Sequence, residues 1–436
     1  MVYSILAILI AISLYYFLNI SSYSEPSPVD CKLELNKFLR FKITALQELP
    51  GECFFRGNYR SARESFISLG SEAGSELIKL MIVEDLSTDI VIIKGRPDQL
   101  IVHVSGTHGV EAFAGSSIQL AALKLLKQEK KELGIDYENI YPTIAFVHAL
   151  NPYGFNYLRR VNENNIDLNR NFLDLDKFNF VKSRDPNFAG YQEADMIFNP
   201  TYKHTKNIYI NDILSYLLMA YVALVKGIGH MKQALVSGNY YKSTGLGFGG
   251  FELSKSASSL IKFVNTHDIF KSAQEIIFID VHTGLGPRGV DTLVIQGSDT
   301  NVLKDSIFKT TYSDSNKKVI NGGLKEDMLS GYNFTVGMTN DYFCGNKVLS
   351  PHLDKSSRLC VIQEFGTVPT LIVGKTQIDE NYAFHFGTEE EKKLYSTRML
   401  SSFFVNTTDW KRKIVKRGLT VILESIDYFS SKPIVV

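Results

Sequence analysis

Apolar runs that end in clusters of polar residues constrain the fold of this chain more than any other feature of its sequence. Leu100–Val104, Thr143–Ala149, Ile276–Val281 and Leu359–Ile362 have the composition and length of buried strands. Segments with helical periodicity lie between them, for example Ser116–Leu133. Strands that alternate with helices form a mostly parallel sheet with helices on both faces. We therefore expect an α/β fold built on a single large mixed sheet.

One further segment is apolar enough to be compared with a membrane span. It runs from Asp212 to Ile228 and includes Lys226. Because charged residues bound it at both ends, we expect a buried helix rather than a span. After Pro28 the chain has no long Pro/Gly/Ser-rich linker and no internal repeat. We therefore assign residues 25–436 to one domain.

The N-terminal residues 1–24 differ from the rest of the chain. Val2–Ile20 carries no charge and is long enough to cross a bilayer. Ser22 and Ser24 offer a small-x-small cleavage pattern before Glu25. We expect either a membrane anchor, in contact with the bilayer through residues 2–20, or a cleaved signal peptide. The protein would then be a single-pass membrane protein or a secreted one.

The side of the membrane is indicated by opposing signals. The basic residues that follow the segment would hold that end in the cytosol under the positive-inside rule; they are Lys32, Lys37, Arg40 and Lys42. The tripeptides that begin at Asn19, Asn333 and Asn406 match the glycosylation acceptor pattern, and the even cysteine count agrees with a lumenal domain. We place the chain in the secretory pathway.

Composition excludes several other classes of protein. The 47 Lys and Arg residues are balanced by 46 Asp and Glu residues, so we expect no nucleic-acid partner. The four cysteines are too few for a disulfide scaffold, and no Cys-x-x-Cys pair offers a zinc site.

Two of the polar clusters carry residues that bind metals. The first, Ser105–Glu111, places His108 three residues before Glu111 in a turn that opens a helix, so both side chains can face one ion. The second places His282 at the end of a strand before a glycine-rich turn, with Asp280 two residues earlier on the same side, where its carboxylate can orient a metal ligand. Taken singly, a capping glutamate and hydrogen-bonded structural histidines would explain these residues as well.

The other two clusters carry charged groups suited to substrates. Asparagine and arginine residues crowd the loop Arg159–Phe172, in which Arg160, Asn169 and Arg170 can bind carboxylates. Glu364 ends an apolar strand, where a carboxylate is costly unless it is paired or used as a general base. Alone, these clusters would be a polar turn and a salt-bridged glutamate.

Together, the order of the four clusters resembles the zinc carboxypeptidase superfamily. The phrases Gly106-Thr-His-Gly-Val-Glu111 and Asp167-Leu-Asn-Arg-Asn-Phe172 resemble a largely uncharacterised branch, which is related also to succinylglutamate desuccinylase and aspartoacylase. The resemblance implies a carboxypeptidase-like (phosphorylase/hydrolase-like) fold.

The resemblance also implies roles for single residues. His108, Glu111 and His282 would bind one Zn²⁺ per chain, and Glu364 would activate the attacking water. Arg160 would polarise the scissile carbonyl and stabilise the oxyanion, and Asn169 with Arg170 would hold a substrate carboxylate. A substrate-binding tyrosine is also typical; Tyr332 and Tyr342 are candidates.

Three functions remain open from the sequence. The first is a zinc-dependent hydrolase of an amide or peptide bond beside a free carboxylate, most simply a metallocarboxypeptidase. The second is a deacylase of small N-acyl amino acids, and the third is a non-catalytic binding protein on the same fold. The stretch 173–275 is longer than the family core needs, and its segment Asn239–Gly250 is a candidate active-site loop.

Overall fold

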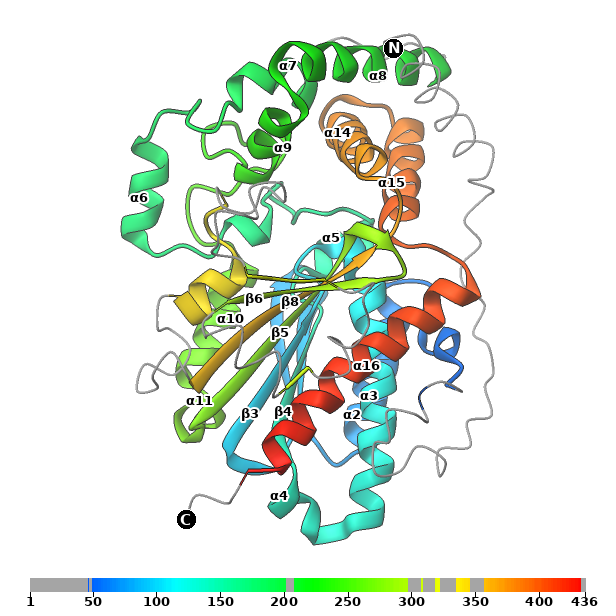
Figure 1. Cartoon of the computed structure of the whole chain (residues 1–436), viewed down its shortest axis with the longest axis vertical. Coiled ribbons are helices and arrows are strands. Elements are labelled where there is room, and N and C mark those ends of the chain that lie inside the picture. Colours follow the sequence, from blue (N-terminus) through cyan, green and yellow to red (C-terminus); the bar gives the residue numbers. More distant parts are fainter. Residues whose placement is uncertain are drawn as a thin grey trace.

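A mixed eight-stranded sheet forms the centre of the protein, as the computed structural model shows (Figure 1). The structure describes residues 46, 49–200, 208–296, 307–308, 318–321, 335–345 and 357–432. The strand order is β1-β2-β4-β3-β5-β8-β6-β7. The strands are β1 (Glu76–Val83), β2 (Leu86–Ile93), β3 (Arg96–Ser105), β4 (Pro142–His148), β5 (Glu275–Arg288), β6 (Asp291–Gln296), β7 (Lys318–Asn321) and β8 (Arg358–Gly366).

The four central strands are parallel and bring three of the polar clusters together. β3 pairs in parallel with β4 and with β5, and β5 pairs in parallel with β8. The outer pairs β1–β2, β2–β4 and β6–β8 are antiparallel. Because carboxyl ends of parallel strands share one edge, His282 of β5 stands in register beside Glu364 of β8. The predicted α/β class and mixed, mostly parallel sheet are confirmed.

Helices cover both faces of the sheet. On one face, Ile101, Phe146 and Ile279 pack into the core formed with α2, α3 and α16; on the other face, Val102 and Phe278 pack against α10 and α11. This alternation follows from the period of two along a strand. The α-helices are α2 (Tyr59–Glu72), α3 (Ala112–Leu133), α4 (Tyr137–Ile140), α5 (Pro152–Tyr157), α6 (Leu175–Ser183), α7 (Asp195–Phe198), α8 (Ile208–Lys226), α9 (Ile228–Ser237), α10 (Lys255–Thr266), α11 (Asp268–Ser272), α14 (Thr370–Phe386), α15 (Glu389–Phe403) and α16 (Thr408–Ser430).

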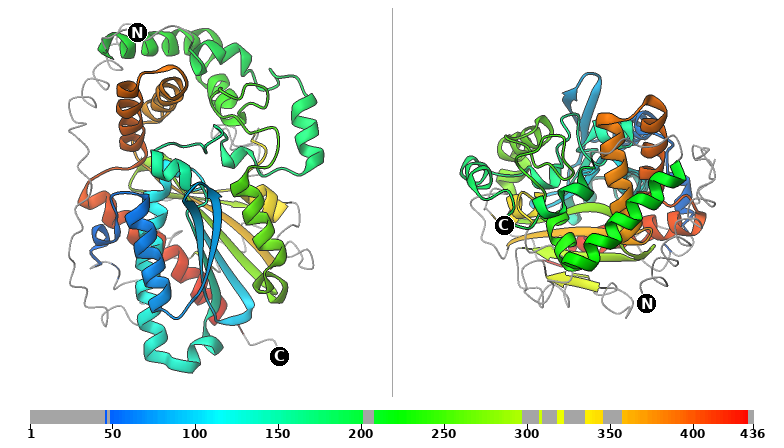
Figure 2. Two further views of the ribbon diagram at one scale, coloured as in Figure 1. Left: turned by 180° about the vertical axis from the view of Figure 1, so that it is seen from behind. Right: turned by 90° about the horizontal axis from the view of Figure 1, so that it is seen from above.

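A second group of helices lies over one end of the sheet. Figures 1 and 2 show α6, α7, α8 and α9 from the predicted long insertion, with α14 and α15, stacked beyond the end of the strands. We call these six helices the roof. Buried ion pairs join its two parts, since Asp212 of α8 lies 2.7 Å from Lys375 of α14 and 3.3 Å from Arg398 of α15.

The helix predicted for Asp212–Ile228 forms, as α8, but the prediction that it is buried is wrong. Leu214, Leu217 and Leu224 are 46%, 41% and 65% exposed. The apolar composition of this segment correctly predicts a helix. It does not determine whether other parts of the chain cover the apolar side of that helix.

Within the described ranges, none of the helices alone has the length and apolarity of a membrane span. The bent pair Ile210–Lys226 and Gly229–Ser237, whose axes differ by 106°, meets the same criterion of length and composition. The predicted anchor or signal peptide in residues 1–24 lies outside the described residues.

A disulfide joins the last strand to a segment beside it. Cys344, in the short π-helical turn Asp341–Gly345, is bonded to Cys360 of β8. The bond ties residues 335–345 to the strand that carries Glu364.

Candidate metal centre

A tight turn after β3 positions the first histidine. Gly106 has φ +68°, and a Cβ at Gly109 would lie 2.1 Å from the backbone of Gly154, so only glycine fits there. The amide of Gly109 donates to the carbonyl of Arg160 at 3.1 Å. These contacts fix the turn that carries His108 against the loop that carries Arg160.

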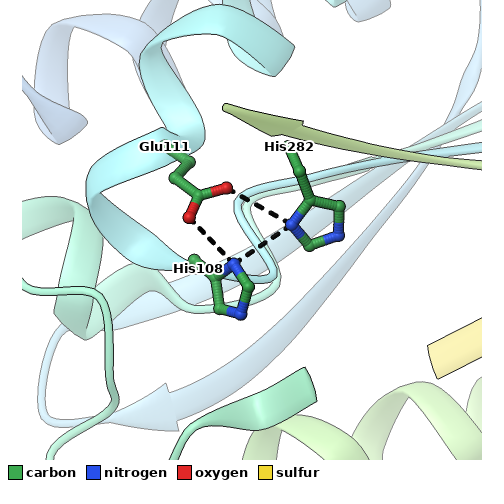
Figure 3. A group of neighbouring side chains, drawn as sticks. All are labelled: His108, Glu111 and His282. Carbon is green, nitrogen blue, oxygen red and sulfur yellow. Dashed lines mark hydrogen bonds and ion pairs between the residues drawn. The ribbon is translucent and has the colours of Figure 1, made fainter. Parts of the chain in front are cut away.

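Three side chains bring potential ligand atoms to one point (Figure 3). The Nδ1 of His108 lies 2.9 Å from Oε1 of Glu111 and 3.1 Å from Nδ1 of His282. The Nδ1 of His282 lies 3.3 Å from Oε2 of Glu111. The ligand atoms all lie within 4.8 Å of one another, and the three residues are at most 3% exposed. Two imidazole nitrogens and a carboxylate are a donor set that suits zinc.

A second carboxylate stands behind each histidine. The Nε2 of His108 lies 3.1 Å from Oδ1 of Asp167, and the Nε2 of His282 lies 3.0 Å from Oδ2 of Asp280. Thr107 donates to the other oxygen of Asp280 at 2.8 Å. With the outer nitrogen of each ring beside a carboxylate, both Nδ1 atoms can face a cation.

The sequence suggested this role for Asp280 but missed it for Asp167. Asp167 was visible only as part of the phrase Asp167-Leu-Asn-Arg, and no spacing rule links it to His108.

The charges around the cluster favour a cation at its centre. Burial alone would raise the pKa of Glu111, but His108, His282 and Arg160 hold that pKa below its usual value. Burial would lower the pKa of His282, but Asp280 and Glu111 raise it well above its usual value. The carboxylates therefore stabilise positive charge at this point, which a bound divalent cation would supply.

Arg160 and Glu364 lie at the edge of the ligand cluster. Arg160 donates from Nη1 to Oε1 of Glu111 at 2.7 Å and from Nε to Oδ2 of Asp167 at 3.3 Å. Oε1 of Glu364 accepts from the backbone amide of Leu285 at 2.9 Å. Burial, together with the negative charge of Glu111, raises the pKa of Glu364 to about 7. A carboxylate with such a pKa can accept and return a proton near neutral pH.

Asn169 and Arg170 are held by the backbone around them. Oδ1 of Asn169 accepts from both the amide and the hydroxyl of Thr339, at 3.0 and 3.1 Å. Arg170 donates from Nε to the carbonyl of Val236 at 2.7 Å. The roof helix α9 and the segment 335–345 thus support these two side chains.

All the predicted site residues line one cavity of about 130 Å³. These residues are His108, Glu111, Arg160, Asn169, Arg170, His282 and Glu364. The rest of the lining is largely apolar and includes Leu235, Val236, Leu246, Met338 and Ile362. The structure therefore brings residues from all four clusters to one cavity.

The remaining predictions about the lining have mixed outcomes. The loop Asn239–Gly250 reaches the cavity through Leu246 and Gly247, which agrees with its expected position. Tyr342 packs against Phe172 and Phe343 in an apolar cluster and is not among the described residues that line the cavity. Tyr332 lies outside the described residues.

One family model matches most of the chain. The family described as "Protein of unknown function (DUF2817)" matches residues 55–417. The chain belongs to this family. All the described residues that line the cavity lie within the part of the chain that the DUF2817 model matches.

Solved structures similar to this DUF2817 chain include bovine thrombin-activatable fibrinolysis inhibitor in complex with tick carboxypeptidase inhibitor, at 11% identity and a TM-score of 0.41. That match covers 81% of this chain and 98% of the other. A metallo-carboxypeptidase from Burkholderia cenocepacia matches at 12% identity and a TM-score of 0.36, over 84% of this chain and 69% of the other. No curated protein matches the chain.

Proposed function

We propose that residues 25–436 form a zinc-dependent hydrolase that cleaves an amide or peptide bond beside a free carboxylate, most simply a metallocarboxypeptidase. One observation carries this proposal: the three potential metal ligands, the buried Glu364 and the side chains of Arg160, Asn169 and Arg170 line the same cavity. A chance collection of polar residues would not combine these chemical types at one point.

His108, Glu111 and His282 would hold the zinc ion, with Asp167 and Asp280 orienting the two rings. When bound, zinc lowers the pKa of a water molecule and stabilises negative charge on a carbonyl oxygen. Glu364 accepts a proton from the attacking water and returns it to the leaving nitrogen. The guanidinium of Arg160 stabilises the negative charge that develops on the carbonyl oxygen.

Asn169 and Arg170 hold the carboxylate of the substrate. The Arg170 guanidinium is fixed by the carbonyls of Val236 and Asn169, at 2.7 and 2.9 Å, so its position is set before a substrate arrives. Fixing the carboxylate fixes the distance from it to the bond that is cleaved. The substrate is therefore a peptide or an N-acyl amino acid with a free carboxylate.

The size of the cavity favours a second candidate function. A volume of about 130 Å³ is below the roughly 300–1,000 Å³ of pockets that take drug-sized ligands. A deacylase of small N-acyl amino acids, similar to desuccinylases and aspartoacylases, would need little more space. A panel of short peptides and N-acyl amino acids, each with a free or amidated carboxylate, separates the two activities. No turnover of either class by zinc-loaded protein would leave the non-catalytic binding protein.

Substitution of Arg170 by Ala tests the grip on the carboxylate. We expect kcat/KM for substrates with a free carboxylate to fall by about 10²-fold, because a charge-assisted hydrogen-bond pair is lost. The same substitution should hardly change the slower turnover of amidated substrates. Arg60→Ala, at an exposed arginine paired with Asp85, is the control. An equal loss on both substrate forms would contradict the assigned role.

Substitution of Asp167 by Asn tests the orientation of His108. We expect zinc affinity, measured by competition with a chelator, to fall about 10- to 100-fold, because the ring loses its charged partner. Asp185→Asn, at an exposed loop residue, should leave the affinity unchanged. If Asp167→Asn binds zinc as tightly as the unsubstituted chain, Asp167 does not orient the ligand.

We also propose that the protein is exported, as an anchored or a secreted form. The Cys344–Cys360 disulfide supports this, because such bonds persist in oxidising compartments. The acceptor asparagine Asn406 is exposed, as glycosylation would require.

A further inference from the structure

The roof helix α8 buries the polar side chains of Asn211, Asp212 and Ser215 and exposes most of its described large apolar residues. Its buried side carries Asp212, which is 4% exposed and forms ion pairs with Lys375 and Arg398. Its outer side carries large apolar residues that are each 41–65% exposed. We call them the α8 stripe; they are Ile213, Leu214, Leu217, Tyr221, Leu224 and Val225.

The spacing of the stripe makes it one continuous surface. Ile213, Leu217, Tyr221 and Leu224 follow one another at intervals of four, four and three residues, so they lie on one side of the helix. Single exposed apolar residues are ordinary, but a contiguous apolar surface on a soluble domain marks an interaction site. Figures 1 and 2 place α8 across the outer end of the roof, away from the sheet.

We propose that the α8 stripe lies on the surface of a lipid bilayer, with its apolar side chains in the boundary between headgroups and acyl chains. Amphipathic helices bind membranes in this way. The proposal does not depend on the hydrolase activity, but it uses the apolar segment Val2–Ile20 as a membrane anchor.

The length of chain before the described residues supports a bilayer as the partner. Val2–Ile20 would be about 28 Å long as a helix, which matches the hydrocarbon thickness of a membrane. Residues 21–45, fully extended, span at most about 90 Å. An anchor in the bilayer would therefore keep Leu46, at the start of the described chain, within that distance of the membrane surface, and the domain that carries the roof would stay close to the membrane.

A bilayer also covers more apolar surface than the alternative partners. Val2–Ile20 carries no charge and is mostly apolar, so packing it along the α8 stripe would leave most of its own apolar surface in water. A second copy of the chain on the stripe would leave the segment uncovered altogether. One bilayer covers the segment and the stripe together.

The membrane contact would be connected to the cavity through α9. α8 ends at Lys226, the chain turns at Gly227, which has φ +90°, and α9 follows. Leu235 and Val236, near the end of α9, line the cavity. A substrate with an apolar chain in the bilayer would thus approach the cavity along the roof.

Spin labels on single introduced cysteines test the proposal in the full chain. The described native cysteines are all disulfide-bonded, so Leu217→Cys and Leu224→Cys can be labelled selectively. Met81→Cys, on the edge strand β1 and 43% exposed against 41% for Leu217, is the matched control. Each labelled chain is reconstituted in phosphatidylcholine vesicles, and its circular dichroism and thermal unfolding must equal those of the unlabelled chain.

The measurement is the accessibility of each label to oxygen, which concentrates in lipid, and to a water-soluble nickel chelate. We expect the oxygen-to-nickel ratio at Leu217 and Leu224 to be severalfold higher than at Met81. Equal ratios at all three positions would place the stripe in water and overturn the proposal. Shielding of the two α8 labels from both reagents would overturn it as well, because protein would then cover the stripe.

Discussion

Replacing Glu364 by Gln is expected to lower kcat by about 10²–10⁴-fold, while the chain keeps its zinc and its thermal stability. Glu364 is 8% exposed and accepts a hydrogen bond from the amide of Leu285. Glutamine has the same shape and retains an oxygen for this hydrogen bond. It cannot accept the proton of the attacking water, so the proton transfer is lost. The fold should be retained.

The pH dependence of turnover gives the same prediction a second readout. Burial raises the pKa of Glu364 to about 7, and only the ionised form can act as the base. Turnover of the unsubstituted chain should therefore rise as the pH increases through the pKa of Glu364. A bound cation would lower this pKa, because its positive charge favours the ionised carboxylate. The residual turnover of Glu364→Gln should lack this acid limb.

The matched control is Glu163→Gln. Burial also raises the pKa of Glu163, but this residue is not among those that line the cavity. Its substitution should leave kcat and the pH profile unchanged. Near-normal turnover by Glu364→Gln would remove Glu364 from the mechanism.

Replacing His108 and His282 together by Ala is expected to reduce the zinc content from about one ion per chain to almost none, and to abolish turnover. Catalytic zinc is usually held by three protein ligands, and Glu111 alone would remain. Elemental analysis of the purified chain, after zinc repletion, is the measurement.

A histidine far from the site provides the control for this loss. His267 pairs with Glu76 at 3.1 Å and is partly buried, so His267→Ala should retain the full zinc content. Equal zinc in the double variant would show that the ion binds elsewhere. If the folded, unsubstituted chain binds no zinc, the site serves another ion or none, and the binding-protein function becomes the better account.

The sequence predicted the sheet and the candidate site together, because one physical rule connects them. Each cluster follows an apolar strand, and parallel strands bring their carboxyl ends to one edge. His282 and Glu364, although far apart in the chain, are therefore neighbours across β5 and β8. The residue types in the clusters then indicated which side chains could bind a metal and which could bind substrate or transfer a proton.

Other features depend on contacts that no local pattern contains. Asp167 supports His108 only because the turn after β3 folds against the loop after α5. The exposure of α8 depends on which other segments pack over the helix, and amino-acid composition does not determine those tertiary contacts. The pairing of Cys344 with Cys360 requires that the π-helical turn reach the side of β8, and four cysteines allow three pairings.

The disulfide between Cys344 and Cys360 has a practical consequence for producing the protein. The segment that it ties to β8 includes Thr339, which holds Asn169, and Met338, which lines the cavity. A disulfide that closes a loop of this length stabilises a fold by about 3 kcal/mol. Chains made in the reducing cytosol of a bacterial host would lack this tether, and one side of the substrate-binding wall would be loosened. Recombinant material for every assay above should therefore come from a periplasmic or eukaryotic secretory expression system, with free thiols titrated before use.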